Sequence, residues 1–199
     1  MTEITPDLQW NPLLDSETAA AIVALIDSTV ADGGMLGHAE PMSVEAASHF
    51  ITQLGRRIAD GDTHLLLGRV ANTPTFLAML NPNSMPNCRH TAELTKGVVH
   101  PAWRGRRLVE LAFEALVVRA DALGIQQFVL DVREGSRAHT LWQRFGFVSY
   151  GVLDDYARVD GLSFRGHYMV QSVSMLRERT ASSRQFASNQ TKKEGNHVA

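Results

Sequence analysis

Two segments near the N-terminus carry apolar residues at helical spacing, residues 15–30 and 43–58. In the first segment Asp15 or Ser16 is placed to act as the N-cap, and Ser43 takes that position in the second. Both runs stop at a polar cluster that contains glycine, of the kind that ends helices. The pattern therefore predicts two helices before the first strand.

Three short apolar runs then have the length and composition of β-strands: His64–Val70, Thr75–Leu80 and Glu93–Val99. The turn residues at 72–74 (NTP) join the first two as a hairpin. Gly97 lies inside the third strand, where a glycine often marks a bulge or a close approach of another backbone.

Helices and strands alternate in the second half of the chain. A broad apolar stripe predicts a helix that begins near Leu108 and ends at Gly124. The elements predicted after it are a strand Gln127–Val132, a helix Arg137–Phe145, and strands Phe147–Gly151 and His167–Met175. The order α-α-β-β-β-α-β-α-β-β indicates an α/β (α+β) class and a single domain over residues 1–178. Residues 179–199 are too polar to form a core and are predicted to be a disordered tail.

Composition narrows the function classes. With 199 residues, of which 44% are hydrophobic, the chain is long enough to bury one sizeable core. A net charge of −2, without a long basic face, leaves little support for a nucleic-acid partner. Cys88 is the single cysteine and the histidines are scattered, so neither a disulfide nor a metal site is predicted. No apolar run approaches the roughly 20 residues that span a bilayer, which favours a cytoplasmic protein with no membrane partner.

The stretch VVHPAWRGRRLVELAF, residues 98–113, indicates an anion-binding site. It predicts a strand, then a turn containing Arg104, Arg106 and Arg107, then a helix whose first N–H groups have no partner in the helix. Cations at a helix N-terminus cost about 0.3–1 kcal/mol each, so three of them favour a compensating anion. Guanidinium groups suit phosphate, and the stretch lacks both GK[ST] and GxGxxG, so neither an ATP-type loop nor a dinucleotide fingerprint is predicted.

VHPAWRGRRLVELAF and the later LDVREGSRAHTLWQRFGF resemble the two core motifs of the GCN5-related N-acetyltransferases, the GNAT superfamily. The family pattern [RQ]-x-x-G-x-[GA] holds the pyrophosphate of acetyl-CoA, and A-x-x-[LF]-Y-x-x-x-G-[FY] builds the other half of the cofactor site. The matching residues are Arg104, Gly105, Leu108, Ala138, Leu141, Gly146 and Phe147. HTAELTKGVVHP, YGVLDDYARVDG and the glycines at 33 and 34 resemble the branch that includes tabtoxin-resistance acetyltransferases. The resemblance covers about residues 30–173.

The resemblance implies a GNAT fold, with a central, mostly antiparallel mixed sheet, a splayed parallel pair of strands, and helices on both faces. It implies acetyl-CoA as the co-substrate and a small-molecule amine as its acceptor, and it leaves the oligomeric state open, a homodimer being one option. The implied cofactor-binding residues are Gly97, Val98, Val99, Arg104, Gly105, Arg106, Arg107, Leu108, Val109 and Ala138. Backbone N–H groups at residues 97–99 would polarise the thioester carbonyl.

Glu93, Asp131, Trp142 and Tyr156 are the candidate catalytic residues. Glu93 and Asp131, acidic as in the family branch, could attract an ammonium group and accept its proton, and burial at a strand end is expected to raise the pKa of Asp131. Trp142 stands where many members have a tyrosine that protonates the CoA thiolate. Its indole N–H can donate a hydrogen bond but not a proton, so water, Tyr150 or Tyr156 are the alternatives for that step.

Two residues depart from the family pattern at its glycine positions. Arg107 replaces the first glycine, and Val109 replaces the following glycine or alanine and adds bulk near the expected pyrophosphate. The leading hypothesis is an N-acetyltransferase that acetylates a primary amine of a small molecule, such as an amino-acid-like metabolite or toxin. Two alternatives stay open: a GNAT-fold protein that binds CoA without acetylating, and an enzyme that catalyses a different biosynthetic reaction.

Overall fold

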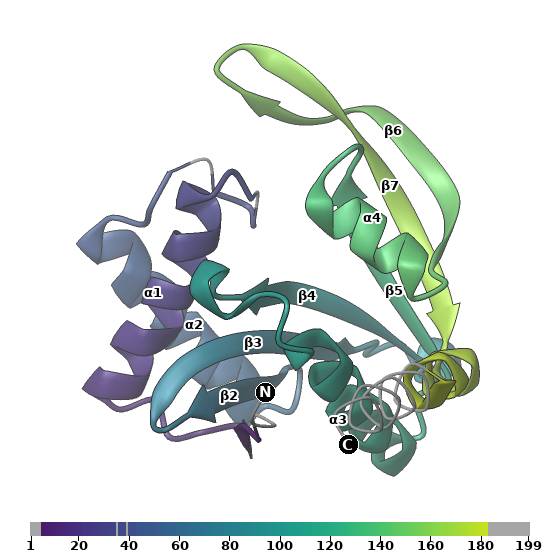
Figure 1. Ribbon diagram of the computed structural model, residues 1–199, viewed down its shortest axis with the longest axis horizontal. Coiled ribbons are helices and arrows are strands. Elements are labelled where there is room, and N and C mark those ends of the chain that lie inside the picture. Colours follow the sequence, from purple (N-terminus) through teal and green to yellow (C-terminus); the bar gives the residue numbers. More distant parts are fainter. Residues whose placement is uncertain (1–4, 35, 39, 183–199) are drawn as a thin grey trace, which may run out of the picture.

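The computed structural model describes residues 5–34, 36–38 and 40–182, and its centre is a seven-stranded sheet in the order β1-β2-β3-β4-β5-β7-β6 (Figure 1). The strands are β1 (Asp7–Trp10), β2 (His64–Val70), β3 (Thr73–Pro82), β4 (Thr91–Val99), β5 (Gln127–Arg133), β6 (Val148–Val159) and β7 (Leu162–Ser172). The α-helices are α1 (Ser16–Ala31), α2 (Val44–Ala59), α3 (Leu108–Leu123) and α4 (Arg137–Arg144), with 3-10 turns at Pro86–Cys88 and Pro101–Trp103. Among the strands of the described residues, β4 and β5 are the one pair that runs parallel. The predicted mixed α/β fold, mostly antiparallel with one parallel pair, is confirmed.

The two N-terminal helices begin at the residues that the sequence indicated. The Asp15 carboxylate accepts a hydrogen bond from the Thr18 amide at 2.8 Å, and the Ser43 hydroxyl accepts one from the Ala46 amide at 3.2 Å. Each bond satisfies one of the N–H groups that the first helical turn leaves unpaired. Both predicted N-caps are therefore confirmed, and the first is Asp15 rather than Ser16.

The prediction that two helices precede the first strand is wrong. Strand β1 comes before α1 and pairs antiparallel with β2, with Asp7 opposite Arg69 and Trp10 opposite Leu66. It is four residues long and mostly exposed, so it lacks the apolar run by which the other strands were predicted. A short, polar edge strand of this kind has a weak sequence signal.

The C-terminal part of the predicted sheet also needs correction. Strand β6 continues to Val159 and turns through Asp160 and Gly161, which have φ of 52° and 77°. Most of the stretch between the two predicted strands, residues 152–166, therefore belongs to a hairpin. Residues 173–182 are helical, where a strand had been predicted up to Met175. Packing continues to Thr180, which is buried, and the predicted tail from residue 183 onward lies outside the described residues.

Helices cover both faces of the sheet. Helices α1 and α2 pack on one face, where apolar residues of α1 meet Leu65, Leu77 and Met79. Helix α3 covers the other face, and Phe113 of α3 shares a core cluster with Phe128 of β5 and residues of α4. The core is therefore divided by the sheet into two layers (Figure 1).

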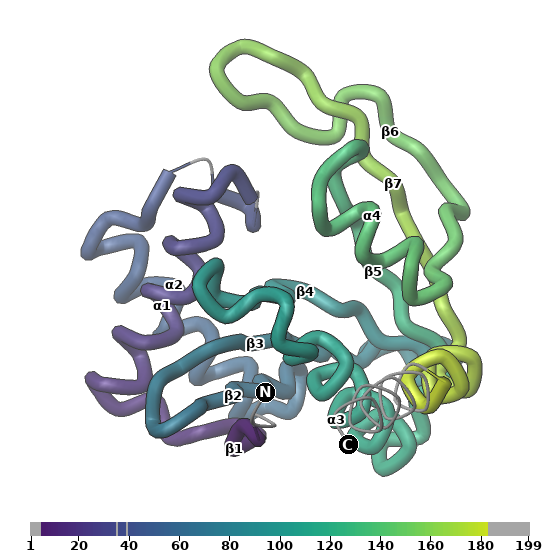
Figure 2. Tube along the Cα trace, in the orientation of Figure 1, coloured from purple at the N-terminus to yellow at the C-terminus, as the bar shows by residue number. Residues whose placement is uncertain are grey.

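The sheet opens between its two parallel strands. Strands β4 and β5 pair over three positions only, from Thr91 opposite Gln127 to Glu93 opposite Val129. Beyond these positions β4 remains paired with β3, and β5 remains paired with β7. Residues 94–99 of β4 and residues 130–133 of β5 are therefore not paired with one another in the described strands. The Cα trace shows two diverging arms, one ending in the long β6–β7 hairpin (Figure 2). We call the region between residues 94–99 and 130–133 the splay.

Two glycines give a stability test of the packing. Gly68 of β2 faces the buried Phe76 ring, which a Cβ at position 68 would overlap, so Gly68→Ala is expected to destabilise the protein by about 1–3 kcal/mol. Gly55, inside α2, has room for a methyl group, whose nearest neighbour would be Leu14 Cδ1 at 3.6 Å. Gly55→Ala should stabilise the helix by about 0.5–1 kcal/mol. Chemical denaturation of the two variants measures both effects, and equal effects of the same sign would contradict the packing described here.

Candidate functional site

The splay is bordered by a bulge in β4. Leu77 of β3 pairs with Val98 and Met79 pairs with Thr95, so Lys96 and Gly97 together stand opposite one residue of β3. The predicted bulge is thus present, but the residue with positive φ is Lys96, at 51°, and not Gly97. A bulge redirects the side chains that follow it.

The strand beside the bulge is fixed by a buried amide. Asn81 of β3 donates through Nδ2 to Thr95 Oγ1 at 2.9 Å and to the Glu93 carbonyl at 3.4 Å, and its Oδ1 accepts from Thr63 at 2.8 Å and from Arg57 at 3.1 Å. Because Asn81 is buried and its amide is fully used, it holds β4 in register up to the bulge. The sequence analysis did not single out this residue.

The two bulge residues face opposite sides of the splay. A Cβ placed on Gly97 would lie 3.5 Å from Cζ2 of Trp142, on the side covered by α3 and α4. The Lys96 ammonium instead donates a hydrogen bond to the carbonyl oxygen of Leu36, in the connection between α1 and α2. Since Gly97 has no side chain, the indole can approach the β4 backbone closely.

Trp142 combines a structural position with contact to the splay. Its ring lies 5.5 Å from Phe113 and 5.0 Å from Phe147, measured between centroids, and packs against the core cluster of α3 and β5. Trp142 is therefore an aromatic residue packed against the core, and the same ring reaches Gly97. The indole is rigidly held at the place where the family's tyrosine was expected.

The three arginines precede α3 instead of lying in its first turn. After the 3-10 turn Pro101–Trp103, the chain passes through Gly105 at φ 74° and Arg107 at φ 61°, and α3 begins at Leu108. Arg107 is the N-cap residue and its side chain makes no capping bond to the helix. A left-handed conformation explains why the family has glycine at this position, and a non-glycine residue costs about 1–2 kcal/mol there.

Each arginine has a different environment. Arg104 is ion-paired with Asp32, at the end of α1, at 2.5 Å, and Arg137 of α4 contacts the same carboxylate at 2.9 Å. The hydrogen bond from Arg104 lowers the pKa of Asp32, and the nearby positive charges act in the same direction. Arg106 lies over the ring of Trp103, 4.7 Å from its centroid. No local sequence pattern indicated these contacts of Asp32, because its partners are distant in sequence.

The remaining predicted cofactor residues divide into buried and accessible ones. Val98 and Leu108 are buried, so they can offer a ligand only their backbone groups. The side chain of Val109 is partly buried and packs against the core cluster of α3. Ala138 is exposed in the first turn of α4.

On the α1–α2 side of the splay, Glu93, Asp131 and Tyr156 lie together. Glu93 and Asp131 stand on the two parting strands, and the Tyr156 hydroxyl donates a hydrogen bond to Asp131. Partial burial raises the pKa of Glu93 and the Asp131 carboxylate raises it further. Burial, and then the bond to Asp131, raise the pKa of the Tyr156 phenol. Asp131 itself is solvent-exposed, so the expected burial at this strand end is wrong.

A glycine places the Tyr156 ring. A Cβ on Gly166 of β7 would overlap the ring of Tyr156, so the ring lies across the glycine. Gly166 pairs with Arg133 at the end of β5, which brings the phenol beside Asp131 on the same strand. The Tyr156 hydroxyl is thereby hydrogen-bonded to Asp131, and its raised pKa makes it a poorer proton donor than a free phenol.

The neighbouring acidic residues of the hairpin bond to other residues of β6 and β7. Asp154 is paired with Arg165 at 2.9 Å, and Asp155 accepts hydrogen bonds from Arg158 and Ser163. These bonds lower the pKa of Asp155 to about 2. Among residues 154–156, Tyr156 is the one whose side chain bonds to a residue of the splay, Asp131.

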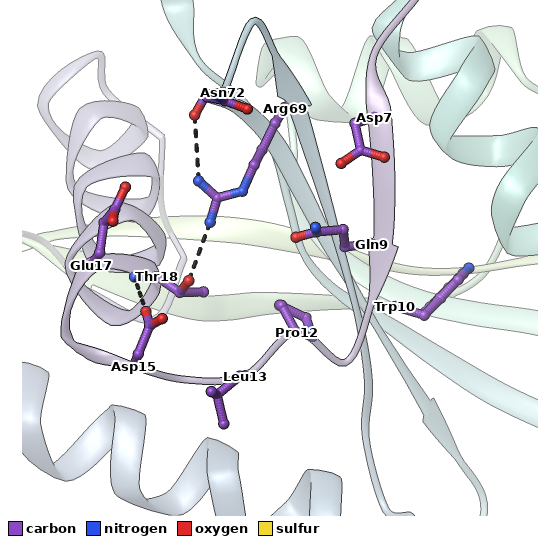
Figure 3. Close-up of a pocket in the computed structure, with 10 residues that line it drawn as sticks. All are labelled: Asp7, Gln9, Trp10, Pro12, Leu13, Asp15, Glu17, Thr18, Arg69 and Asn72. Atoms are coloured by element: carbon purple, nitrogen blue, oxygen red, sulfur yellow. Dashed lines mark hydrogen bonds between the residues drawn. The ribbon is translucent and has the colours of Figure 1, made fainter.

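A separate depression lies at the edge of the sheet beside β1, with a volume of about 630 Å³ (Figure 3). Arg69 lies in it and bonds to Thr18 Oγ1 at 3.2 Å and to the Asn72 carbonyl at 3.4 Å. Its guanidinium is thus held by the protein itself, and the depression is built from elements other than those of the splay. Within the described residues, no group of His, Cys, Asp and Glu side chains could hold a metal ion, and no helix could cross a membrane.

Several solved structures that are described as acetyltransferases share this fold. An N-acetyltransferase from Staphylococcus aureus Mu50 superimposes with a TM-score of 0.69 at 15% identity, covering 84% of this chain and 99% of that chain. A putative acetyltransferase from Salmonella typhimurium, solved with its cofactor acetyl-CoA, gives 0.67 at 17% identity, covering 84% and 94%. A ribosomal-protein-alanine N-acetyltransferase from Brucella melitensis gives 0.69 at 17% identity, covering 83% and 99%.

The structural matches establish the fold, and a sequence match establishes the family. The model of the acetyltransferase (GNAT) family matches residues 38–147, more than half of the chain. The chain therefore belongs to the GNAT family of acetyltransferases, as its two motifs indicated. Among curated proteins, no sequence matches it significantly.

Acetyl-CoA is the co-substrate of this family, and the residues present fit it. The turn before α3 brings Arg104 and Arg106 to a helix N-terminus that Arg107 leaves uncapped, which suits a diphosphate. Residues 94–99 of β4 have backbone groups on the β5 side with no strand partner in the described chain, which suits the amides of an extended arm. When bound, the coenzyme supplies the activated acetyl group.

The left-handed conformation at Arg107 gives a second stability test. Arg107→Gly removes the steric cost of φ 61°, whereas Arg107→Ala keeps that cost, and both variants lose the guanidinium. The glycine variant is expected to be more stable than the alanine variant by about 1 kcal/mol, after allowance for the backbone entropy of glycine. Thermal or denaturant unfolding of the pair measures the difference. An alanine variant as stable as the glycine variant would show that the turn has another conformation.

Proposed function

We propose that the protein is a cytoplasmic N-acetyltransferase that moves an acetyl group from acetyl-CoA to a primary amine of a small molecule. The observation that carries this proposal is the two-sided splay. Its α3–α4 side has the bulge residue Gly97 and the arginine turn, and its α1–α2 side has Glu93 and Asp131. A donor that enters from one side and an amine that enters from the other would meet beside the bulge.

The donor side is assigned by its backbone and its arginines. The diphosphate would be held by Arg104, Gly105, Arg106 and Arg107, together with the free N–H groups of Leu108 and Val109 at the start of α3. Backbone N–H groups of residues 97–99 would bind the thioester oxygen as negative charge develops on it. Ala138, accessible at the start of α4, would line the opposite wall.

The acceptor side is assigned by its carboxylates. Two acidic groups on the parting strands attract an ammonium group, and Glu93, with its raised pKa, is suited to take up the proton that the amine must lose. Tyr156 orients Asp131 through its hydrogen bond. The Trp142 indole would steady the leaving thiolate, and solvent would supply the proton. General-acid help is worth about 10²–10⁴ in rate, so transfer without it is slower but still feasible.

An amino-acid-like acceptor is supported by one structural relative and one motif. A putative phosphinothricin N-acetyltransferase superimposes with a TM-score of 0.66 at 17% identity, covering 84% of this chain and 99% of that chain. The stretch HTAELTKGVVHP resembles the tabtoxin-resistance branch, whose substrates are of a similar kind. We assign the acyltransferase domain to residues 1–178, extended by the helix to residue 182, with the rest as a tail.

A CoA-binding protein without transferase activity is the second candidate. It is favoured by the packing of Trp142 against Phe113 and Phe147, which gives the indole a purely structural explanation. Release of CoA from acetyl-CoA in the presence of a library of primary amines, above the rate of spontaneous hydrolysis, would eliminate this candidate.

Binding of the coenzyme tests the donor side. Arg104→Ala should weaken the affinity for acetyl-CoA by about tenfold or more, because a hydrogen bond to a charged group contributes about 1.5–3 kcal/mol. Arg158→Ala is the matched control, since it also removes an arginine paired with an aspartate, but on the β6–β7 hairpin. Isothermal titration calorimetry with acetyl-CoA and with CoA measures the affinity of both variants. Failure of the wild-type protein to bind either ligand would defeat the proposal. An equal loss of affinity in both variants would show that the diphosphate does not bind at Arg104.

The pH profile tests the acceptor side. The raised pKa of Glu93 means that its basic form is lost as the pH falls through a value above the usual range of a glutamate. Acetylation should therefore rise with pH over an acidic limb, and Glu93→Gln should remove that limb and slow the reaction by about 10²-fold. Glu17→Gln, on α1, is the control. An unchanged limb in Glu93→Gln would assign the proton transfer to another group.

A further inference from the structure

The splay contains a lysine in a chain that otherwise uses arginine. The lysines are Lys96, Lys192 and Lys193, and the other cationic side chains among the 19 lysines and arginines are guanidinium groups. A lysine can lose its proton and act as a nucleophile, whereas an arginine stays charged. Lys96 is thus the one lysine among residues 5–34, 36–38 and 40–182.

Lys96 occupies the acceptor side of the bulge. Its neighbour Gly97 faces Trp142 on the donor side, while the Lys96 ammonium donates to the Leu36 carbonyl. A Cβ on Gly37 would lie 3.3 Å from the same nitrogen, so Leu36 and Gly37 lie directly beside it. The amine is therefore held on the acceptor side, and it belongs to a residue directly adjacent in the chain to the backbone proposed to bind the thioester.

The charges around Lys96 are those proposed to prepare an acceptor amine. Burial lowers the pKa of Lys96, and the Asp131 carboxylate opposes this shift with a smaller effect. The same Asp131 raises the pKa of Glu93 and accepts the bond from Tyr156. Lys96 therefore lies close enough to Asp131 to be affected by its charge, and more of it is neutral than of an exposed lysine.

We propose that Lys96 is an internal acetyl acceptor, so that the protein acetylates itself at this residue. This inference rests on the proposed function, because it uses the same donor and the same bulge. The Lys96 nitrogen attacks the thioester carbonyl carbon, an N–C bond forms, and the C–S bond breaks. The nitrogen releases its protons to Asp131, Glu93 or water, the thiolate takes one proton from solvent, and acetyl-lysine and CoA are the products.

Acetylation would change the splay. The product amide has no charge, so the attraction to Asp131 is lost, and one N–H remains in place of three donors. The longer side chain would stay on the acceptor side, between β4 and the α1–α2 connection. Self-acetylated protein is therefore expected to acetylate small amines more slowly than unmodified protein.

Peptide mass spectrometry after incubation with isotope-labelled acetyl-CoA tests the inference on the full chain. The expected result is a labelled acetyl group on Lys96 that appears well before any label on Lys192 or Lys193, which report the background chemical reactivity of the protein. Arg104→Ala should slow the labelling of Lys96 and leave that of the other two lysines unchanged. A Lys192→Arg/Lys193→Arg double variant should label like the wild type.

Lys96→Arg is the complementary variant, because it keeps the charge and removes the nucleophile. It should take up no label at position 96 while binding acetyl-CoA as the wild type does. Acetyl-CoA binding without labelling of Lys96, or labelling no faster than that of Lys192 and Lys193, would overturn the inference and leave the proposed function standing. Absence of acetyl-CoA binding in the wild type would overturn both.

Discussion

The parting of β4 from β5 is the constraint on which the rest of the structure depends. Parallel strands inside a sheet normally satisfy each other's backbone along their whole length, and here they do so over three positions only. The strands can diverge because each keeps an antiparallel partner, β3 for one and β7 for the other. Everything assigned to the site stands on the backbone and side chains that this separation leaves accessible.

The bulge gives the splay its two different sides. One added residue in β4 lets Gly97 accept the close approach of Trp142 while Lys96 reaches the α1–α2 connection. Asn81 fixes the strand just before this point, so the change of direction falls at a defined residue. The donor side and the acceptor side proposed above are thus separated by a local irregularity of the backbone.

Sequence patterns predicted the parts of this architecture that depend on local physics. Helix caps such as Asp15 and Ser43, the apolar runs of β2 and β5, and the arginine turn are each readable within a few residues. Strand β1 was missed because it is short, polar and stabilised by pairing with β2. The contacts of Lys96 with Leu36 and of Tyr156 with Asp131 join residues that are far apart in the chain, and no local pattern reports them.

Asp32 forms ion pairs with residues next to two different helices, α3 and α4. Arg104 leads into α3 and Arg137 begins α4, yet both direct a guanidinium at this one carboxylate. A diphosphate bound at the proposed site would therefore replace Asp32 as the anionic partner of Arg104. Its net attraction would be a difference between two sets of ion pairs, and its binding would release the end of α1 from this contact.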